Sequence, residues 1–377
     1  MTAVRLASAD DRALDWGDDP AMGRYAAALA ALPDDGRLGN AAFALSVLQL
    51  PGRAFLVCAP DADVSQTWLL SLRTIYGRVA AEEAERTATG MQGAMFAAGA
   101  RTTGAWLSAT AADRLVFVNH PLLSTSLWGG WRGTGLAEAL EALRAEWSDR
   151  AFAFRSLNAW SDAALIDALR KTGARLLPSR VVWTVDDAAG EWLRKRDARR
   201  DLRLIERGGY VVERVAGLSD AEWMRVRELY RDLYLGRHSR WNPDYSQDLL
   251  RAGLSSGFLR FQILRNPEGR IDAFVACARA GGILTSPLLG YDLSQPQEAG
   301  LYRMTMLLPG LEAARDGLRV NHSAGAGVFK RMRGARPQLE YMAVCDGHLP
   351  LRRRLAYGVL ARGLDAVTPA LMRIATA

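Results

Sequence analysis

The sequence predicts an α/β protein in which two similar units follow one another along the chain. Its 377 residues exceed one ordinary domain, and about half of them are hydrophobic, which is enough for more than one core. Short β-branched and aromatic segments alternate with segments of helical period. Their order between residues 53 and 185 recurs between residues 210 and 344, and this recurrence predicts a tandem fold.

The first unit is expected to begin with helices and to end with alternating strands and helices. Leu115–Val118 predicts a buried strand, because it is β-branched and aromatic without a helical period. Trp68, Leu72 and Ile75 share one face of a helical pattern. The expected elements are helices over 20–32, 39–50 and 64–86, a strand over 53–58, short strands or a hairpin within 87–113, then strand 115–118, a helix from 136, strand 151–157, helix 162–171 and strand 181–185.

The second unit is expected to repeat this order after a charge-rich boundary. Asp186–Gly190 interrupts the last strand, and residues 191–207 predict an arginine-rich helix. On one interpretation the arginines of this helix contact RNA phosphates. On the other, the helix is a solvated connection whose arginines form ion pairs with its own acidic residues, and we favour this second interpretation. The later elements are strand 210–215, helix 220–235 capped by Ser219, strands 257–265, 271–279 and 283–291, helix 301–316, strand 318–323, helix 328–333 and strand 339–344.

These elements give four expected parts: a first domain over residues 1–187, a linking helix over 188–207, a second domain over 208–350, and a basic amphipathic helix over 351–377. A helix of the last kind lies on an acidic membrane, docks a carrier protein or packs on its own domain. We favour packing on its own domain.

A glycine loop follows the strand at Leu115–Val118 and opens the helix at 136. In such a loop the glycines allow a close approach to the backbone, and the first N–H groups of the helix point at the ligand. A strand, a glycine loop and a helix start together form a geometry that binds anionic phosphate. Arg132-Gly-Thr-Gly-Leu-Ala137 is therefore a candidate phosphate site.

Arg132-x-x-Gly135-x-Ala137 resembles the Arg/Gln-x-x-Gly-x-Gly/Ala pyrophosphate loop of the GNAT acyltransferases, which cradles the diphosphate of acyl-coenzyme A. The resemblance continues through the following strands and helices to Val185. It implies two tandem GNAT-like domains, each a mixed, mostly antiparallel sheet flanked by helices. About seven extra residues precede the loop, and Leu169 stands where many members place a tyrosine acid. The residues that the resemblance assigns to the donor are Arg132, Gly133, Thr134, Gly135, Leu136, Ala137 and Asn158, the last of them beside the pantetheine region.

The second half resembles the FemAB-like branch, which includes the Fem-type aminoacyl-tRNA-dependent transferases and the cellulose-biosynthesis-type acetyltransferases. The similar residues are Gly300-Leu-Tyr-Arg303, Ala326-Gly-Val-Phe-Lys330 and Arg333-Gly-Ala-Arg-Pro337. In that branch an aromatic–lysine pair lies beside the transfer site, which implies such a place for Phe329 and Lys330. Tyr302 replaces a small residue of the pyrophosphate loop, so we expect this half to lack a full coenzyme site.

The composition restricts the other function classes. The net charge of +7 favours anionic partners, but almost all basic residues are arginine, so the charge alone does not define a partner. Three widely spaced cysteines, Cys58, Cys277 and Cys345, form neither a disulfide framework nor a metal cluster, and we expect buried thiols. With no apolar run of 18 residues and no basic, apolar leader, we expect a cytoplasmic protein without a transmembrane span. We expect neither a metal cofactor nor a DNA partner.

Acyl transfer to an amine needs a held donor, a group that binds its carbonyl oxygen, and a base that takes the amine proton. His120 and His322 each end a strand, and the usual pKa of histidine suits a base. Lys330 is a candidate counter-charge, although a merely exposed lysine is the alternative. His238, in a polar aromatic loop, and Phe329 are the candidates for binding the acceptor.

The sequence therefore predicts an N-acyltransferase with its acceptor site between the two halves. The donor is an acyl-coenzyme A or the phosphopantetheine thioester of an acyl-carrier protein, and the acceptor is an amine of a small molecule or peptide. Two alternatives stay open: a Fem-type transferase that uses charged tRNA, and a binding module whose catalytic sites have decayed.

Overall fold

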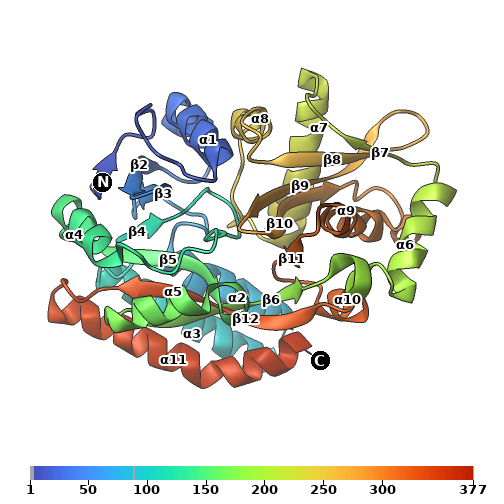
Figure 1. Cartoon of the computed structure of the whole chain (residues 1–377). Helices are drawn as coiled ribbons and strands as arrows, with labels where there is room; N and C mark the ends of the chain where they lie inside the picture. The colour runs from blue at the N-terminus through green and yellow to red at the C-terminus, as the bar shows by residue number, and fades with distance from the viewer. Residues whose placement is uncertain (1–3, 88–89, 377) are drawn as a thin grey trace.

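The computed structural model describes residues 4–87 and 90–376. The parts of the expected first domain, of the expected hairpin and of the expected tail helix that fall on residues 1–3, 88–89 and 377 lie outside the described residues. The described strands form one sheet of 12 strands in the order β1-β2-β3-β4-β5-β12-β6-β11-β10-β9-β8-β7. Figure 1 shows the first half of the chain, in blue and green, beside the yellow and orange second half.

The strands of the first half are β1 (Arg5–Ala7), β2 (Phe43–Leu50), β3 (Arg53–Pro60), β4 (Leu115–Val118), β5 (Ala151–Asn158) and β6 (Arg175–Val185). Those of the second half are β7 (Val211–Arg214), β8 (Arg260–Arg265), β9 (Ile271–Ala280), β10 (Ile283–Tyr291), β11 (Arg319–Asn321) and β12 (Arg336–Cys345). The α-helices are α1 (Pro20–Ala31), α2 (Ala80–Thr87), α3 (Gly90–Ala109), α4 (Leu136–Glu146), α5 (Ala159–Lys171), α6 (Arg196–Arg207), α7 (Asp220–Arg231), α8 (Gln247–Ser255), α9 (Leu301–Asp316), α10 (Gly327–Met332) and α11 (Leu351–Thr376).

Both halves have the same topology. In the first, β1 to β4 pair in antiparallel fashion, and β4 then pairs in parallel with β5 after the crossover through α4. In the second, β7 to β10 are antiparallel, and β10 pairs in parallel with β11 after α9. The predicted α/β class and the mixed, mostly antiparallel pairing are confirmed.

The last strand of each half lies against the other half. β12 is inserted between β5 and β6, in antiparallel pairing with both, while β6 also pairs with β11 of the second half. The sequence assigns residues 339–344 to the second domain, but this strand completes the sheet of the first. The expected boundaries at 187 and 208 therefore separate stretches of sequence, while the sheet continues across them (Figure 1).

Two predictions for the first half are wrong, and a third, the helix over 64–86, holds only from residue 72 onward. Residues 39–50 are not a helix: Phe43–Leu50 is β2, which turns at Pro51–Gly52 and pairs along its whole length with β3. Residues 87–113 are not a hairpin: the helix α3 covers 90–109. Its glycines have a packing role, because a Cβ on Gly77 would lie 2.8 Å from the Cα of Gly104. The small residues that weakened the helical pattern let two helical segments meet.

The tail helix α11 packs on the first half of its own chain, as favoured from the sequence. Tyr357 is fully buried, and its hydroxyl donates to the carbonyl of Ala112 at 2.7 Å. Arg352 donates to the carbonyl of Ala109 at the end of α3. Within the described part of the chain, no helix is both long and apolar enough to cross a bilayer. The three cysteines are buried free thiols, as predicted.

Candidate active site

A cavity opens where β10 and β11 separate. The two strands pair only from Ile283↔Arg319 to Thr285↔Asn321, and the chain then leaves β11 at His322. On its other side β10 has an irregular register with β9 between Thr285 and Leu288, at Ser286–Pro287. A proline in a central strand removes a ladder donor and marks such a bulge. The separation leaves a cavity of about 390 Å³.

Both halves of the chain line this cavity. The second half supplies the end of β10, the segment 322–326, the start of α9 and the segment 230–245, while Trp68, Ser124 and Arg180 come from the first half. Three of the residues singled out from the sequence, His238, His322 and Lys330, meet here. The expected cleft between the two halves is thus present.

His322 lies on the floor of the cavity. His322 is 2% exposed, and neither nitrogen of its ring has a hydrogen-bond partner in the protein. Its ring stacks on the indole of Trp192, with centroids 4.1 Å apart. Burial and the charge of Lys330 hold the pKa of His322 well below its ordinary value, so the ring is neutral at physiological pH. A neutral imidazole with unpartnered nitrogens is able to accept a proton from a ligand.

Ser286 is the second polar group of the floor without a partner. It is 6% exposed, and its hydroxyl is buried without a hydrogen bond. An unpaired buried hydroxyl costs free energy unless a ligand or a water satisfies it. Ser286 and His322 therefore offer a donor and an acceptor to a polar group that enters between β10 and β11.

Lys330 is buried, and the alternative of an exposed lysine is wrong. Its Nζ donates to the carbonyl oxygens of His322 at 2.7 Å, Ser323 at 3.2 Å and Ala324 at 2.8 Å. Burial, followed by the nearby charge of Arg180, lowers the pKa of Lys330 to about 7. Three acceptors account for the three N–H donors of an ammonium. The lysine therefore holds the segment that carries His322, which makes it a positioning residue.

The two residues predicted to bind the acceptor differ in place. His238 is exposed and lies at the edge of the cavity, next to Tyr234 with ring centroids 5.8 Å apart. Phe329 lies behind the cavity wall. It contacts Tyr302, with centroids 5.1 Å apart, and the guanidinium of Arg333 covers its ring. The cavity is thus in contact with Tyr302, not with Phe329.

The corresponding separation in the first half is partly occupied by the chain itself, and a smaller cavity of about 200 Å³ remains beside Ser156 and Asn158. β4 and β5 pair up to Val118↔Phe154, and the carbonyl of Arg155 then accepts the indole N–H of Trp128 at 2.9 Å. The backbone N–H of Ser126 donates to the hydroxyl of Ser156. Trp128 is 2% exposed. The extra residues before the glycine loop thus occupy part of the separation between β4 and β5.

The glycine loop at 132–137 has left-handed glycines, as a phosphate loop requires, but its neighbours are protein groups. A Cβ on Gly133 would lie 2.6 Å from the Cβ of Ala168, and one on Gly135 would lie 2.9 Å from Leu50. The backbone N–H of Leu136 donates to the carbonyl of Gly133. Arg132, Thr134 and Ala137 are exposed. The loop does not meet the cavity of the second half, and its role as a diphosphate site stays a prediction.

Asn158 and His120 have structural partners. Asn158 caps α5, because its Oδ1 accepts the backbone N–H of Ser161 at 3.1 Å. His120 is fully buried; its Nδ1 accepts the backbone N–H of Leu122, and its Nε2 lies 3.1 Å from the carbonyl of Leu69. Burial, with the charge of Arg155, lowers the pKa of His120 to about 3. Both ring nitrogens of His120 are therefore engaged within the protein, and its role as a base stays a prediction.

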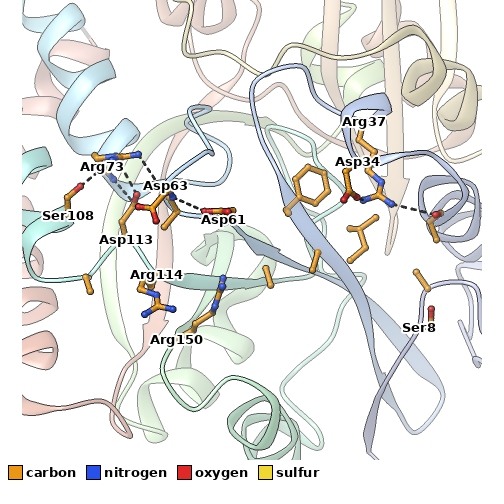
Figure 2. Close-up of a pocket in the computed structure, with 18 of the residues that line it drawn as sticks. Ser8, Asp34, Arg37, Asp61, Asp63, Arg73, Ser108, Asp113, Arg114 and Arg150 are labelled. Carbon is orange, nitrogen blue, oxygen red and sulfur yellow. Dashed lines mark hydrogen bonds and ion pairs between the residues drawn. The ribbon is translucent and has the colours of Figure 1, made fainter.

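A larger cavity, of about 1040 Å³, lies elsewhere, beside β2 and β3 (Figure 2). Its charged side chains pair within the protein. Arg73 contacts Asp113, Arg37 contacts Asp34, and Arg150 donates to the carbonyl of Pro60. Figure 2 shows these groups in two separate clusters. The candidate residues from the sequence do not line this groove, and we do not assign it a reaction.

Sequence reasoning missed the part of the site that depends on contacts between distant segments. Trp68, Ser124 and Arg180 reach the cavity only because the two halves share one sheet. Ser286 had a local signal, since Pro287 inside an apolar segment predicts a bulge.

The part of the chain that forms most of this cavity is similar to a known protein family. Residues 193–323, which form most of the cavity, match the family model of the acetyltransferase (GNAT) domain. No curated protein reaches significant sequence similarity.

Several solved structures are similar in fold. The L-PGS from Bacillus licheniformis is 17% identical, with a TM-score of 0.45 over 60% of this chain and 76% of that one. FemX is 10% identical, with a TM-score of 0.46 over 60% and 78%. A tandem GNAT protein from the clavulanic acid biosynthesis pathway is 12% identical, with a TM-score of 0.40 over 91% and 98%. The predicted resemblance to the GNAT superfamily is confirmed for residues 193–323.

Proposed function

We propose that this protein is an N-acyltransferase whose reaction takes place in the cavity between β10 and β11. The observation that carries the proposal is His322: a buried, neutral imidazole without a protein partner, at the point where the two parallel strands separate. The match of residues 193–323 to an acetyltransferase domain supports an acyltransferase at the level of reaction class.

In the proposed reaction the acceptor amine attacks the carbonyl carbon of an activated acyl group. A C–N bond forms, the bond from the carbonyl carbon to the leaving thiol or hydroxyl breaks, and the amine loses one proton. His322 accepts that proton, and the leaving group gains one from the imidazolium or from water. Ser286, whose hydroxyl lacks a protein partner, is placed to donate to the carbonyl oxygen.

The donor that we propose is an acyl thioester of coenzyme A or of an acyl-carrier protein, and the acceptor is an amine of a small molecule or peptide. A charged tRNA is the second candidate donor, and α6 is the observation that favours it. This helix packs against α9, and together with the two residues before it the helix exposes a set of basic side chains. They are Arg194, Lys195, Arg196, Arg199, Arg200, Arg203 and Arg207. Such a basic surface binds a phosphate backbone with a steep dependence on salt.

The experiment compares the two donor classes with the same purified protein. Transfer from a set of acyl-coenzyme A thioesters to hydroxylamine, a small surrogate amine, is followed as hydroxamate. Parallel reactions use aminoacyl-tRNA, with and without ribonuclease. Transfer from thioesters that ribonuclease leaves intact supports the first donor class, and transfer that ribonuclease abolishes supports the second.

The control is the variant His322→Asn under the same conditions, because it retains a polar side chain of similar size. If neither donor class is bound or used by the wild-type protein, the acyltransferase proposal is overturned in favour of a binding module. If the variant transfers at the wild-type rate, the cavity between β10 and β11 is not the reaction site.

A further inference from the structure

We propose that the cavity between β10 and β11 receives an uncharged, apolar or aromatic acyl group and discriminates against acyl groups that carry a charge of either sign. This inference rests on the proposed function and names the class of its donor. It follows from three features of the cavity: its aromatic wall, its lack of carboxylates, and the protein groups that already engage its two cationic side chains.

The wall of the cavity is largely aromatic. Leu233, Leu289 and Met306 complete a surface that removes apolar groups from water. A volume of about 390 Å³ is at the lower end of ligand cavities and suits part of a small molecule. The aromatic side chains of this wall are Trp68, Tyr230, Tyr234, Tyr245, Tyr291 and Tyr302.

A cationic acyl group finds no counter-charge in this cavity. Among the residues that line it, all of which the structure describes, there is no aspartate or glutamate, whereas Arg180 and Lys330 are present. An aromatic wall alone is able to bind a cation through the faces of its rings. The guanidinium groups of Arg155 and Arg180 already lie 5.2 Å and 5.9 Å from the ring centre of Trp68. A further cation would enter beside charges of its own sign.

An anionic acyl group finds the two cations already engaged. Arg180 forms an ion pair with the buried Glu340 at 2.7 Å and also donates to the carbonyl of Ser124. Lys330 donates to three backbone carbonyls. The charge of Arg180 is therefore balanced inside the protein. A carboxylate would lose its hydration in an aromatic cavity without gaining a strong donor pair.

The test uses three donors of matched length: hexanoyl-, 4-trimethylammoniobutanoyl- and 4-carboxybutanoyl-coenzyme A, with hydroxylamine as the acceptor. We expect the value of kcat/KM for the hexanoyl donor to exceed those of both charged donors by at least about tenfold. The trimethylammonio group is a stringent choice, because an aromatic cage would prefer it. If transfer requires tRNA, the matched set is Nα-acetylmethionyl-, Nα-acetyllysyl- and Nα-acetylglutamyl-tRNA, in which no α-ammonium adds a charge to the acyl group.

Two variants of His238, at the edge of the cavity, test whether charge at the cavity selects the acyl group. His238 is exposed, so replacing it leaves the core intact. His238→Glu places a carboxylate at the entrance and is expected to raise the rate with the cationic donor, relative to the neutral one, by about three- to tenfold. His238→Gln is the matched neutral control and is expected to leave that ratio unchanged.

The outcomes separate this inference from the function on which it rests. Equal or faster transfer of a charged group overturns the inference and leaves the acyltransferase standing. An unchanged ratio for His238→Glu shows that charge at this cavity does not select the donor, and it overturns the inference as well. If the protein uses and binds none of the six donors, the proposed function itself fails.

Discussion

The imidazole of His322 stacks on the indole of Trp192 with ring centroids 4.1 Å apart and an angle of 26° between the planes. Both side chains are buried, and their ring nitrogens have no hydrogen-bond partner in the protein. The stacking fixes the plane of the imidazole without using its nitrogens. The ring is thereby oriented toward a ligand at no cost to its basic lone pair.

Replacing His322 by Asn is expected to lower kcat by roughly 10²- to 10⁴-fold, the usual contribution of a general base. Because the pKa of His322 lies well below its ordinary value, the wild-type enzyme keeps its neutral base as the pH falls through the range where most histidines titrate. Between pH 8 and about 6.5, kcat/KM measured with an acceptor that is uncharged throughout is expected to show no titration of His322, while any change caused by Lys330, whose pKa is about 7, is expected to persist in His322→Asn. A fall within that range that disappears in His322→Asn would contradict a depressed pKa.

Gly310 of α9 lies beneath Trp192, and a Cβ there would come within 2.7 Å of the indole Cδ1. Glycine-to-alanine changes inside helices usually stabilise a protein by about 0.5–1 kcal/mol. Here we expect Gly310→Ala to lower the free energy of unfolding by about 1–3 kcal/mol, because the buried indole has to move. We also expect a lower kcat, since the shift tilts His322. Chemical denaturation and steady-state kinetics measure the two effects.

The matched control is Gly363→Ala in α11, where a Cβ meets nothing within 4 Å. This variant is expected to be as stable as the wild type or more so, with unchanged kinetics. A stabilised and fully active Gly310→Ala protein would show that Trp192 does not position His322.

How much of this site the sequence predicts depends on the range of the interactions. Strands such as β9 and β10 are specified by local apolar patterns, and so is the capped helix α7. The strand at Phe43–Leu50 was mistaken for a helix because its alanines and leucines suit either structure. Only its pairing with β3 decides between them. No local sequence pattern predicts that β12 lies between β5 and β6 or that β6 pairs with β11. This arrangement brings Arg180 of β6 to the cavity.

The candidate residues also divide into features that the local sequence predicts and features that depend on contacts between distant segments. His322 and Lys330 were named from short motifs and do meet in one cavity. Burial was not part of those motifs, so the carbonyl contacts of Lys330 were not predicted. The glycine loop at 132–137 lies between a strand and a helix, as the sequence predicts, and its two glycines have positive φ. Its surroundings depend on Trp128, which comes from the extra residues before the loop and occupies part of the adjoining separation of β4 and β5.

Arg132→Ala tests whether the first half takes part in donor binding. Arg132 is exposed and belongs to the loop that resembles a diphosphate cradle. Since we place the reaction in the second half, we expect the affinity for acyl-coenzyme A, measured by calorimetry, to change by less than about twofold. A loss of about tenfold or more, the size expected for a lost charged hydrogen bond to phosphate, would return the donor to the first half.

Lys330 provides the last prediction, which concerns stability and pH. In the folded protein the pKa of Lys330 is about 7, against 10.5 for an ordinary lysine. Below pH 7 the side chain is charged in both states, and between pH 7 and 10.5 the unfolded chain binds the extra proton. Stability rises with pH wherever the unfolded state binds more protons. Removing this group therefore changes the pH dependence of stability as well as its magnitude.

The variant is Lys330→Met, which retains the aliphatic length but leaves the carbonyls of His322, Ser323 and Ala324 without their donor. We expect a loss of about 2–4 kcal/mol in the free energy of unfolding at pH 7, from unpaired buried carbonyls. The difference between wild type and variant, measured by urea denaturation at several pH values, is expected to grow from pH 7 toward 10. A difference that is constant over this range would show that Lys330 titrates in the folded protein as it does in water.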